Sequence, residues 1–281
     1  MTLTTLLLPL LCAGLSLAAP RTGDTREESA PCAVRKGLPN IGAKLTRGDT
    51  VSVVFIGGSI TCGGGSRGYV QSTERWLRDT YTNATVSCHN AGINGTDSAF
   101  GAKRYDRDVL SHAPDLVLIE FAVNDGRRDH TAHMERMVLK TWMNNPTTDV
   151  AFLYTLAKTH LPDYRDGKLP VAASAHERVA AHYGIPTIGL AHCVASAVNA
   201  GKVPWESFAR DGCHPSTEGY GLFNCVLQRY LPRLFAAGTP GPHSLKTPLT
   251  TGLQVYPPPL VAQEFLVPVF TNAQGIRAAE S

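Results

Sequence analysis

From residue 51 to about residue 237 the chain alternates short runs of β-branched and aliphatic residues with longer stretches of helical periodicity. This alternation is typical of a parallel sheet whose strands are joined by helices. It predicts five strands, at residues 51–56, 85–88, 115–121, 149–154 and 186–190. It predicts five helices, at residues 69–81, 100–112, 131–144, 171–183 and 217–235. The expected fold class is therefore α/β, arranged as a three-layer α/β/α sandwich.

The two ends of the chain differ from this central domain of residues 51–237. Residues 1–18 form an apolar run that ends in small residues, which is typical of a secretory signal peptide cleaved after Ala18. A membrane anchor is the alternative, although the run is shorter than the roughly 20 residues that span a bilayer. We expect residues 19–50 to run over the surface and the Pro-rich residues 238–281 to form an appendage, in which residues 265–270 could add a strand. The sequence thus predicts a secreted, extracellular protein.

Composition excludes several classes of function. The formal net charge is +3, and no basic cluster interleaves with aromatic residues, so we expect no nucleic-acid partner. No later segment is apolar enough to cross a membrane. The sequence does not set an oligomeric state.

Cysteine usage fits an exported protein. Of the seven cysteines, Cys12 leaves with the signal peptide, and six remain. An even number predicts disulfides, of many possible pairings, with buried free thiols as the less favoured alternative. A Cys193–Cys213 bridge would close a loop of plausible length. Because no C-x-x-C pair is present, no zinc site is expected. The six cysteines are Cys32, Cys62, Cys88, Cys193, Cys213 and Cys225.

Glycine-rich and polar segments follow four of the predicted strands. Ser59 lies in G-G-S-I-T (57–61) after the first strand, and Gly95 lies in N-A-G-I-N-G-T (90–96) after the second. Asn124 follows the third strand, and Asp211 and His214 in D-G-C-H-P (211–215) come after the fifth. Since ligands bind at the carboxyl ends of parallel strands, we expect these side chains to meet at one edge of the sheet.

These residue types are the ones that acyl transfer requires. A serine hydroxyl becomes a good nucleophile when an imidazole takes its proton and a carboxylate orients that imidazole. Ser59, His214 and Asp211 can fill these roles. The backbone N–H groups of Ser59 and Gly95 and the side-chain amide of Asn124 can form an oxyanion hole. Glycine at position 95 is expected because a turn that offers its N–H inward leaves little room for a Cβ.

In this order and spacing, the four blocks resemble those of SGNH hydrolases, also called GDSL-type esterases, over roughly residues 51–230. The resemblance implies a flavodoxin-like parallel sheet with strand order 2-1-3-4-5 and no cofactor. It also implies a serine esterase in which Ser59, Asp211 and His214 are catalytic. The first block has Gly58 where much of the family has Asp, which is not a triad member. This form looks most like branches that remove short acyl groups, especially acetyl, from carbohydrates.

Several alternatives stay open at this stage. The same site could serve a lipid esterase or an acyltransferase, and the fold could be a non-catalytic carbohydrate-binding module. Asp125 could act in place of Asn124, but an ionised carboxylate cannot donate to an oxyanion, which favours Asn124. His160 and Tyr164 could touch the substrate.

Other motifs have simpler interpretations. Residues 63–65 are all glycine but lack a nucleotide-binding signature, which favours a flexible loop at the mouth of the site. His176-Glu177 with His182 misses the H-E-x-x-H spacing, which favours a packed amphipathic helix. We expect surface or structural roles for three further histidines, His89, His112 and His192.

Two glycosylation sequons are present, at Asn83 and Asn94. We expect only Asn83 to accept a glycan, because Asn94 adjoins the predicted oxyanion donor Gly95.

Overall fold

A six-stranded sheet forms the centre of the fold in a computed structural model, which describes residues 32–255. Along the sheet the strands lie in the order β1-β6-β5-β4-β2-β3. Strands β2 to β6 pair in parallel, whereas β1 pairs antiparallel with β6 at one edge. The strands are β1 (Cys32–Ala33), β2 (Thr50–Gly57), β3 (Thr85–Gly92), β4 (Leu116–Glu120), β5 (Asp149–Leu153) and β6 (Thr187–Ile188).

The α/β class and the order of the five predicted strands are confirmed. Strand β2 lies between β3 and β4, with Phe55 opposite Asn90 on one side and Leu118 on the other. The prediction of a purely parallel five-stranded sheet is wrong in one detail, because β1 adds a sixth, antiparallel strand.

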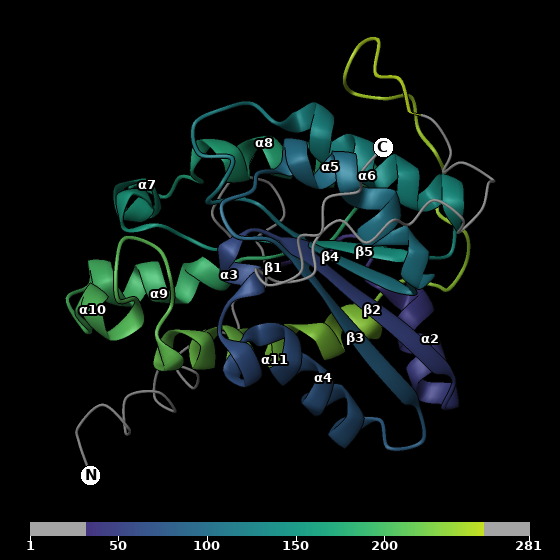
Figure 1. Cartoon of the computed structure of the whole chain (residues 1–281), viewed down its shortest axis with the longest axis horizontal. Helices are drawn as coiled ribbons and strands as arrows, with labels where there is room; N and C mark the ends of the chain where they lie inside the picture. The colour runs from purple at the N-terminus through teal and green to yellow at the C-terminus, as the bar shows by residue number, and fades with distance from the viewer. Residues whose placement is uncertain (1–31, 256–281) are drawn as a thin grey trace, which may run out of the picture.

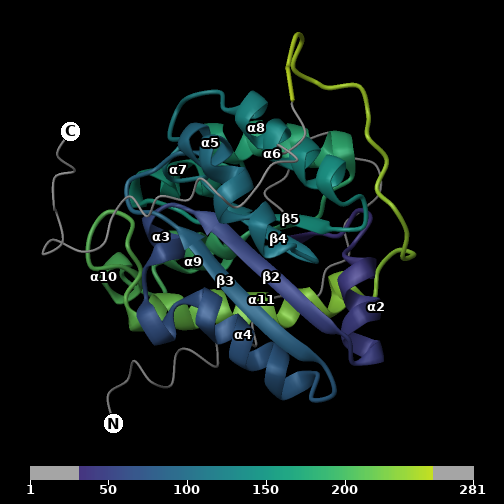
Figure 2. The same cartoon turned by 45° about the vertical axis from the view of Figure 1, so that its right-hand side comes forward.

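Helices cover both faces of the sheet and make three layers (Figures 1 and 2). The helices α2 (Pro39–Arg47), α4 (Tyr69–Thr80), α9 (Leu190–Asn199) and α11 (Thr217–Phe235) pack on one face. The helices α5 (Ser98–Asp108), α6 (Thr131–Asn144) and α8 (Val171–Tyr183) pack on the other. Shorter elements lie at the loops: α3 (Ser59–Cys62), η1 (Gly65–Arg67), η2 (Leu110–His112), η3 (Lys158–His160), α7 (Leu161–Arg165) and α10 (Trp205–Phe208). No helix within residues 32–255 has the length and apolar character needed to cross a bilayer.

Strand β2 shows how the sequence specifies two cores. Side chains alternate between faces along a strand. Val53 and Phe55 therefore lie in the core under α4 and α11, and Val54 and Ile56 in the core under α5 and α6. Burial on both faces accounts for the nearly continuous apolar run, which is the usual pattern of a parallel strand.

The expectation that residues 19–50 run over the surface is wrong for the part that the structure describes. Helix α2 buries Ile41 and Leu45 in the core beside α11, and its N-cap residue Leu38 is buried with them. The backbone N–H of Ile41 donates to Asp149 at the start of β5. The spacing of these apolar residues is helical, but they are few and are separated by polar residues, so the segment was interpreted as a polar surface stretch. Residues 1–31 lie outside the described part, and with them the predicted signal peptide.

Residues 238–255 form an irregular strap that packs on the α6 side of the molecule (Figure 2). His243 stacks on Trp142 with ring centroids 4.8 Å apart and lies 2.9 Å from an Asp149 carboxylate oxygen. The backbone N–H groups of Leu249 and Thr250 donate to the carboxylate of Glu135. The appendage is thus anchored to the main domain as far as residue 255. The strand suggested for residues 265–270 lies outside the described residues.

The predicted disulfides do not form among residues 32–255, where all six cysteines are free. A Cys193–Cys213 bridge is therefore wrong. Cys193 is buried in α9 and directs its thiol to the carbonyl of Leu190, whereas Cys213 lies in a surface loop. Burial raises the pKa of Cys193 to about 11 and that of Cys32 to about 12. These two side chains thus behave as small apolar core residues.

Candidate active site

Ser59 lies at the sharp turn between β2 and the four-residue helix α3. The first turn of α3 is closed by hydrogen bonds from Cys62 N–H to Gly58 O and from Gly63 N–H to Ser59 O. Tyr220 in α11 donates its hydroxyl to the carbonyl of Ile60. The serine is therefore held at the carboxyl end of the sheet, where the sequence predicted it.

His214 and Asp211 complete a hydrogen-bonded chain with Ser59. Nε2 of His214 lies 2.8 Å from Ser59 Oγ, and Nδ1 lies 2.8 Å from Asp211 Oδ2. Asp211 Oδ1 accepts the backbone N–H groups of Cys213 and His214, both at 2.8 Å. These two N–H groups, and then the His214 ring, hold the pKa of Asp211 well below its ordinary value. The structure thus brings the three residues together in the predicted order.

The loop of residues 209–215 that carries this pair is pinned on several sides. Ala209 and Pro215 form an isolated β-bridge across its base. The indole N–H of Trp205 donates to Asp211 O at 2.6 Å, and the backbone N–H of Lys158 donates to Gly212 O at 2.7 Å. These contacts fix His214 although its side chain is half-exposed.

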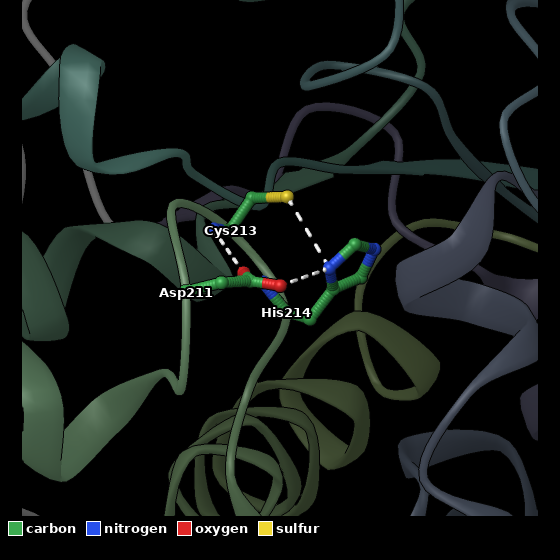
Figure 3. Close-up of side chains that lie close together, drawn as sticks. All are labelled: Asp211, Cys213 and His214. Atoms are coloured by element: carbon green, nitrogen blue, oxygen red, sulfur yellow. Dashed lines mark hydrogen bonds and ion pairs between the residues drawn. The ribbon is translucent and has the colours of Figure 1, made fainter.

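Cys213 lies beside the imidazole but on the wrong side to replace the serine. Figure 3 shows its sulfur and the Asp211 carboxylate approaching the same ring nitrogen of His214, with the thiol 3.7 Å from Nδ1. Burial, followed by the nearby Asp211 charge, raises the pKa of the Cys213 thiol. Nδ1 is already bonded to Asp211, so the free ring nitrogen serves Ser59.

Gly95 and Asn124 line the same cleft as Ser59. Gly95 has φ +69°, and a Cβ built on it would meet nothing within 4 Å. The expectation that crowding requires glycine here is therefore wrong, and the left-handed backbone is the reason instead. A hydrogen bond from Ile93 N–H to Gly57 O ties this turn to the end of β2.

Gly58 is required by a close approach to Asn124. A Cβ at position 58 would lie 2.2 Å from Asn124 Oδ1, so any side chain there must displace the Asn124 amide. This contact gives a physical reason for glycine at position 58 of this chain, because the space that a side chain would need is filled by Asn124.

We expect Gly58→Ala to lower kcat for p-nitrophenyl acetate by about 10²-fold, because the displaced amide no longer meets the oxyanion. KM should change much less. Gly241→Ala is the matched control, since a Cβ there meets nothing within 4 Å and φ is not positive. A wild-type kcat in Gly58→Ala would contradict the assignment of Asn124 to the oxyanion hole.

Asp125, the alternative to Asn124, is 2% exposed and is not among the residues that line the cleft. Its carboxylate accepts the backbone N–H of Ser98 and lies 2.7 Å from Nε2 of His176 and 3.2 Å from Nδ1 of His130. Burial raises the pKa of Asp125, but these partners, His176 first, outweigh it and the net shift is downward. Asp125 therefore links the Asn124 loop to α5 and α8. The predicted packing role of the His176 helix agrees with this arrangement.

Glu120, the last residue of β4, is a fully buried carboxyl that the sequence did not single out. It accepts hydrogen bonds from the Thr155 hydroxyl at 2.6 Å and from Ala122 N–H at 3.1 Å. Burial nevertheless raises its pKa from 4.5 to about 7. Position alone was a signal, because Glu120 ends the strand that leads to Asn124.

This raised pKa predicts a pH-dependent stability. The folded chain binds the Glu120 proton more tightly than the unfolded chain, so this contribution is complete below pH 4.5 and is lost as the pH rises through about 7. Glu120→Gln should remove the loss. The difference in the free energy of unfolding between Glu120→Gln and wild type should shift by about 3 kcal/mol in favour of the variant as the pH rises from 4.5 to about 7. Urea unfolding across this range checks it, and parallel curves for the two proteins would contradict it.

A model of the GDSL-like Lipase/Acylhydrolase family matches residues 55–222, more than half of the chain. The chain belongs to this family. The match confirms the resemblance drawn from the four sequence blocks and makes the chain a GDSL-type ester hydrolase. No curated protein sequence matches it.

Solved structures similar to this GDSL-like hydrolase include two of a two-domain esterase, CEX, active on acetylated mannans. One, co-crystallised with mannopentaose, is 28% identical with a TM-score of 0.67, covering 77% of this chain and 58% of that chain. The other is 26% identical with a TM-score of 0.64, covering 81% and 59%. This chain thus spans less than two thirds of the CEX chain. An acetylxylan esterase of Geobacillus stearothermophilus shares the fold with a TM-score of 0.53 and is 20% identical. The match covers 64% of this chain and 94% of that chain.

The cleft of this GDSL-like hydrolase has a volume of about 790 Å³. Besides the residues already described, it contains Arg67, Arg210 and Tyr220, none of which was predicted as a site residue. The sequence offered a partial signal, since Arg210 directly precedes Asp211. The predicted substrate contacts His160 and Tyr164 do not line this cleft.

Three donor groups of the site are spaced closely enough to hold a cation. Ligand atoms of Asp211, Cys213 and His214 lie within 4.8 Å of one another (Figure 3). A cation there would replace the Asp211–His214 hydrogen bond that orients the imidazole toward Ser59. We therefore assign Asp211 and His214 to proton transfer.

Proposed function

We propose that this GDSL-like hydrolase removes acetyl groups from an esterified carbohydrate, with Ser59 as the nucleophile. The observation that carries the proposal is the chain of two 2.8 Å contacts from Ser59 through His214 to Asp211, at the wall of an open cleft. This arrangement supplies a nucleophile, a base and an orienting carboxylate.

In the proposed reaction, Ser59 Oγ attacks the acetyl carbonyl while His214 Nε2 takes the hydroxyl proton. The Ser59 and Gly95 N–H groups and the Asn124 amide stabilise the oxyanion. The C–O bond to the sugar breaks, and the imidazolium returns its proton to the leaving sugar oxygen. Water then attacks the acetyl-Ser59 ester, with His214 again as base, and releases acetate.

The lining of the cleft favours a short acyl group on a polar alcohol. Glycine, asparagine, threonine and arginine are among the lining residues, and Val123, Pro215 and Tyr220 are the larger apolar side chains. A long acyl chain would need a more extended apolar surface than these three provide. The similarity to CEX, whose substrates are acetylated mannans, adds support for a carbohydrate.

Acetate release from acetylated mannan and xylan oligosaccharides tests the proposal, with p-nitrophenyl esters of increasing chain length assayed in parallel. We expect acetyl esters to have the highest kcat/KM, with a steep fall beyond short chains. Preference for long-chain esters would support the lipid esterase instead, and acetyl transfer to an added alcohol in place of hydrolysis would support the acyltransferase.

A fluorophosphonate probe separates an enzyme from a carbohydrate-binding module. A hydrolase with an activated Ser59 should be labelled at this residue under native conditions. Absence of labelling, together with absence of acetate release, would support the binding module.

We also propose that the protein is secreted, as the apolar run of residues 1–18 predicts. Asn83 is exposed in the turn between α4 and β3 and is therefore accessible for glycosylation. Asn94 lines the cleft, where a glycan would obstruct the substrate. Mass spectrometry of protein from a eukaryotic culture medium should find an N-terminus at Ala19 and a glycan on Asn83 alone.

A further inference from the structure

Two arginines line the cleft that holds Ser59. Arg67 ends the short helix η1, and Arg210 directly precedes Asp211. Both residues are exposed. The guanidinium of Arg67 donates one long hydrogen bond, 3.5 Å, to the hydroxyl of Thr217. Within residues 32–255 neither arginine forms an ion pair with a carboxylate.

The charge of the cleft is therefore not balanced. Asp211 is the carboxylate among its lining residues, and it is already occupied by two backbone N–H groups and by His214. The two arginines that line the cleft thus have no anionic partner left among its lining residues. A single unpaired arginine on an open surface does not indicate a binding site. Two arginines in the cleft that holds the nucleophile give the substrate a positively charged environment.

The beginning of α11 adds to this potential. Thr217, the first residue of this 19-residue helix, lines the cleft, and Ser216 caps the helix by accepting the N–H of Gly219. The amino end of a helix carries partial positive charge. Glu218, in the same turn, is not among the lining residues.

We propose that Arg67 and Arg210 form a subsite for a carboxylate of the substrate, so that the preferred carbohydrate contains uronic acid next to the acetylated sugar position. This proposal rests on the proposed acetylesterase function and specifies its substrate. A guanidinium matches a carboxylate in charge and in its planar, two-donor geometry. Such binding would place the acetyl ester at Ser59 without altering the chemical step.

The test compares acetate release from acetylated oligogalacturonides with acetate release from the same oligosaccharides after methyl esterification, which removes the negative charge of the carboxyls. At low ionic strength wild type should hydrolyse the charged form with a kcat/KM about tenfold higher, and added salt should reduce this ratio. Arg67→Gln and Arg210→Gln should each lower the ratio through KM. The double variant should bring it close to one.

Arg47→Gln is the matched control. It removes the same charge at the other end of β2 from Ser59: Arg47 ends α2 just before β2 begins, and Ser59 follows the end of β2. This variant should keep the wild-type ratio. A wild-type ratio near one, or an unchanged ratio in the double variant, would overturn the subsite.

Failure of the subsite and failure of the proposed function give different results. If the methyl-esterified substrate is hydrolysed as fast as the charged one, the esterase stands and the subsite does not. If neither is hydrolysed, calorimetry of Ser59→Ala with unacetylated oligogalacturonide still tests the subsite. Binding that is lost in Ser59→Ala with both arginines replaced would support it, and no binding to Ser59→Ala would overturn it.

Discussion

Replacing Ser59 with alanine should abolish acetate release, lowering kcat by about 10⁵-fold. The substitution removes one oxygen atom, the one that lies 2.8 Å from His214 Nε2. The imidazole stays in place because Asp211 and the loop of residues 209–215 hold it. Little residual rate is expected, since the remaining groups can only position water. Initial rates with p-nitrophenyl acetate and with an acetylated oligosaccharide measure the effect.

Cys213→Ser is the informative companion to this variant. The thiol lies 3.7 Å from His214 Nδ1 and is the other nucleophile near the ring. If Ser59 is the nucleophile, Cys213→Ser should keep activity within about tenfold of wild type, because serine retains the backbone N–H that donates to Asp211. Loss of activity in Cys213→Ser with retention in Ser59→Ala would reverse the assignment.

Asp211→Asn should lower kcat by about 10³-fold or more with little change in KM. The amide oxygen can still accept the N–H groups of Cys213 and His214, so the loop keeps its shape. The amide nitrogen, however, would then donate to His214 Nδ1. The proton of a neutral imidazole is thereby forced onto Nε2, which can no longer accept the proton of Ser59.

The pH dependence distinguishes this explanation from simple unfolding. The pKa of Asp211 is held well below its ordinary value, so the carboxylate stays charged on moderate acidification. Protonation of Asp211 therefore does not account for a loss of activity on moderate acidification. Asp211→Asn should be inactive even at alkaline pH, with an unchanged melting temperature. Recovery of full activity at high pH would contradict the tautomer argument.

The sequence predicted most of the central domain because its long helices have a strong period and its strands are short apolar runs. The ranges 131–144, 171–183 and 217–235 coincide with α6, α8 and α11. Helix α9 (Leu190–Asn199), directly after β6, was not predicted. The segment before β2 was misjudged because α2 is short and its apolar residues are separated by polar ones. Strand β1 has two residues, too few to show any alternation.

The site shows the same division. Ser59, Gly95 and Asn124 were found because each follows a strand of a parallel sheet, and topology brings such positions together. Asp211 and His214 lie between α10 and α11, and they were found because an Asp three residues before a His can orient its imidazole. Arg67 was missed because its position at the cleft depends on the conformation of a glycine-rich loop. Such a loop has no sequence periodicity from which its conformation could be predicted. The reason for Gly58 was also inaccessible, since it depends on an atomic contact with Asn124 from a different strand end.

The hydrogen bonds that hold Asp211 affect how this enzyme can bind a polymeric substrate. Its carboxylate oxygen is oriented by N–H groups two and three residues further along the same turn, and the side chain is half-exposed. The proton-transfer pair is therefore preorganised by local backbone and needs no lid or substrate to assemble it. The acetylated carbohydrate that we propose as substrate can therefore react in the middle of a long polymer, without a closing movement of the part of the chain that the structure describes.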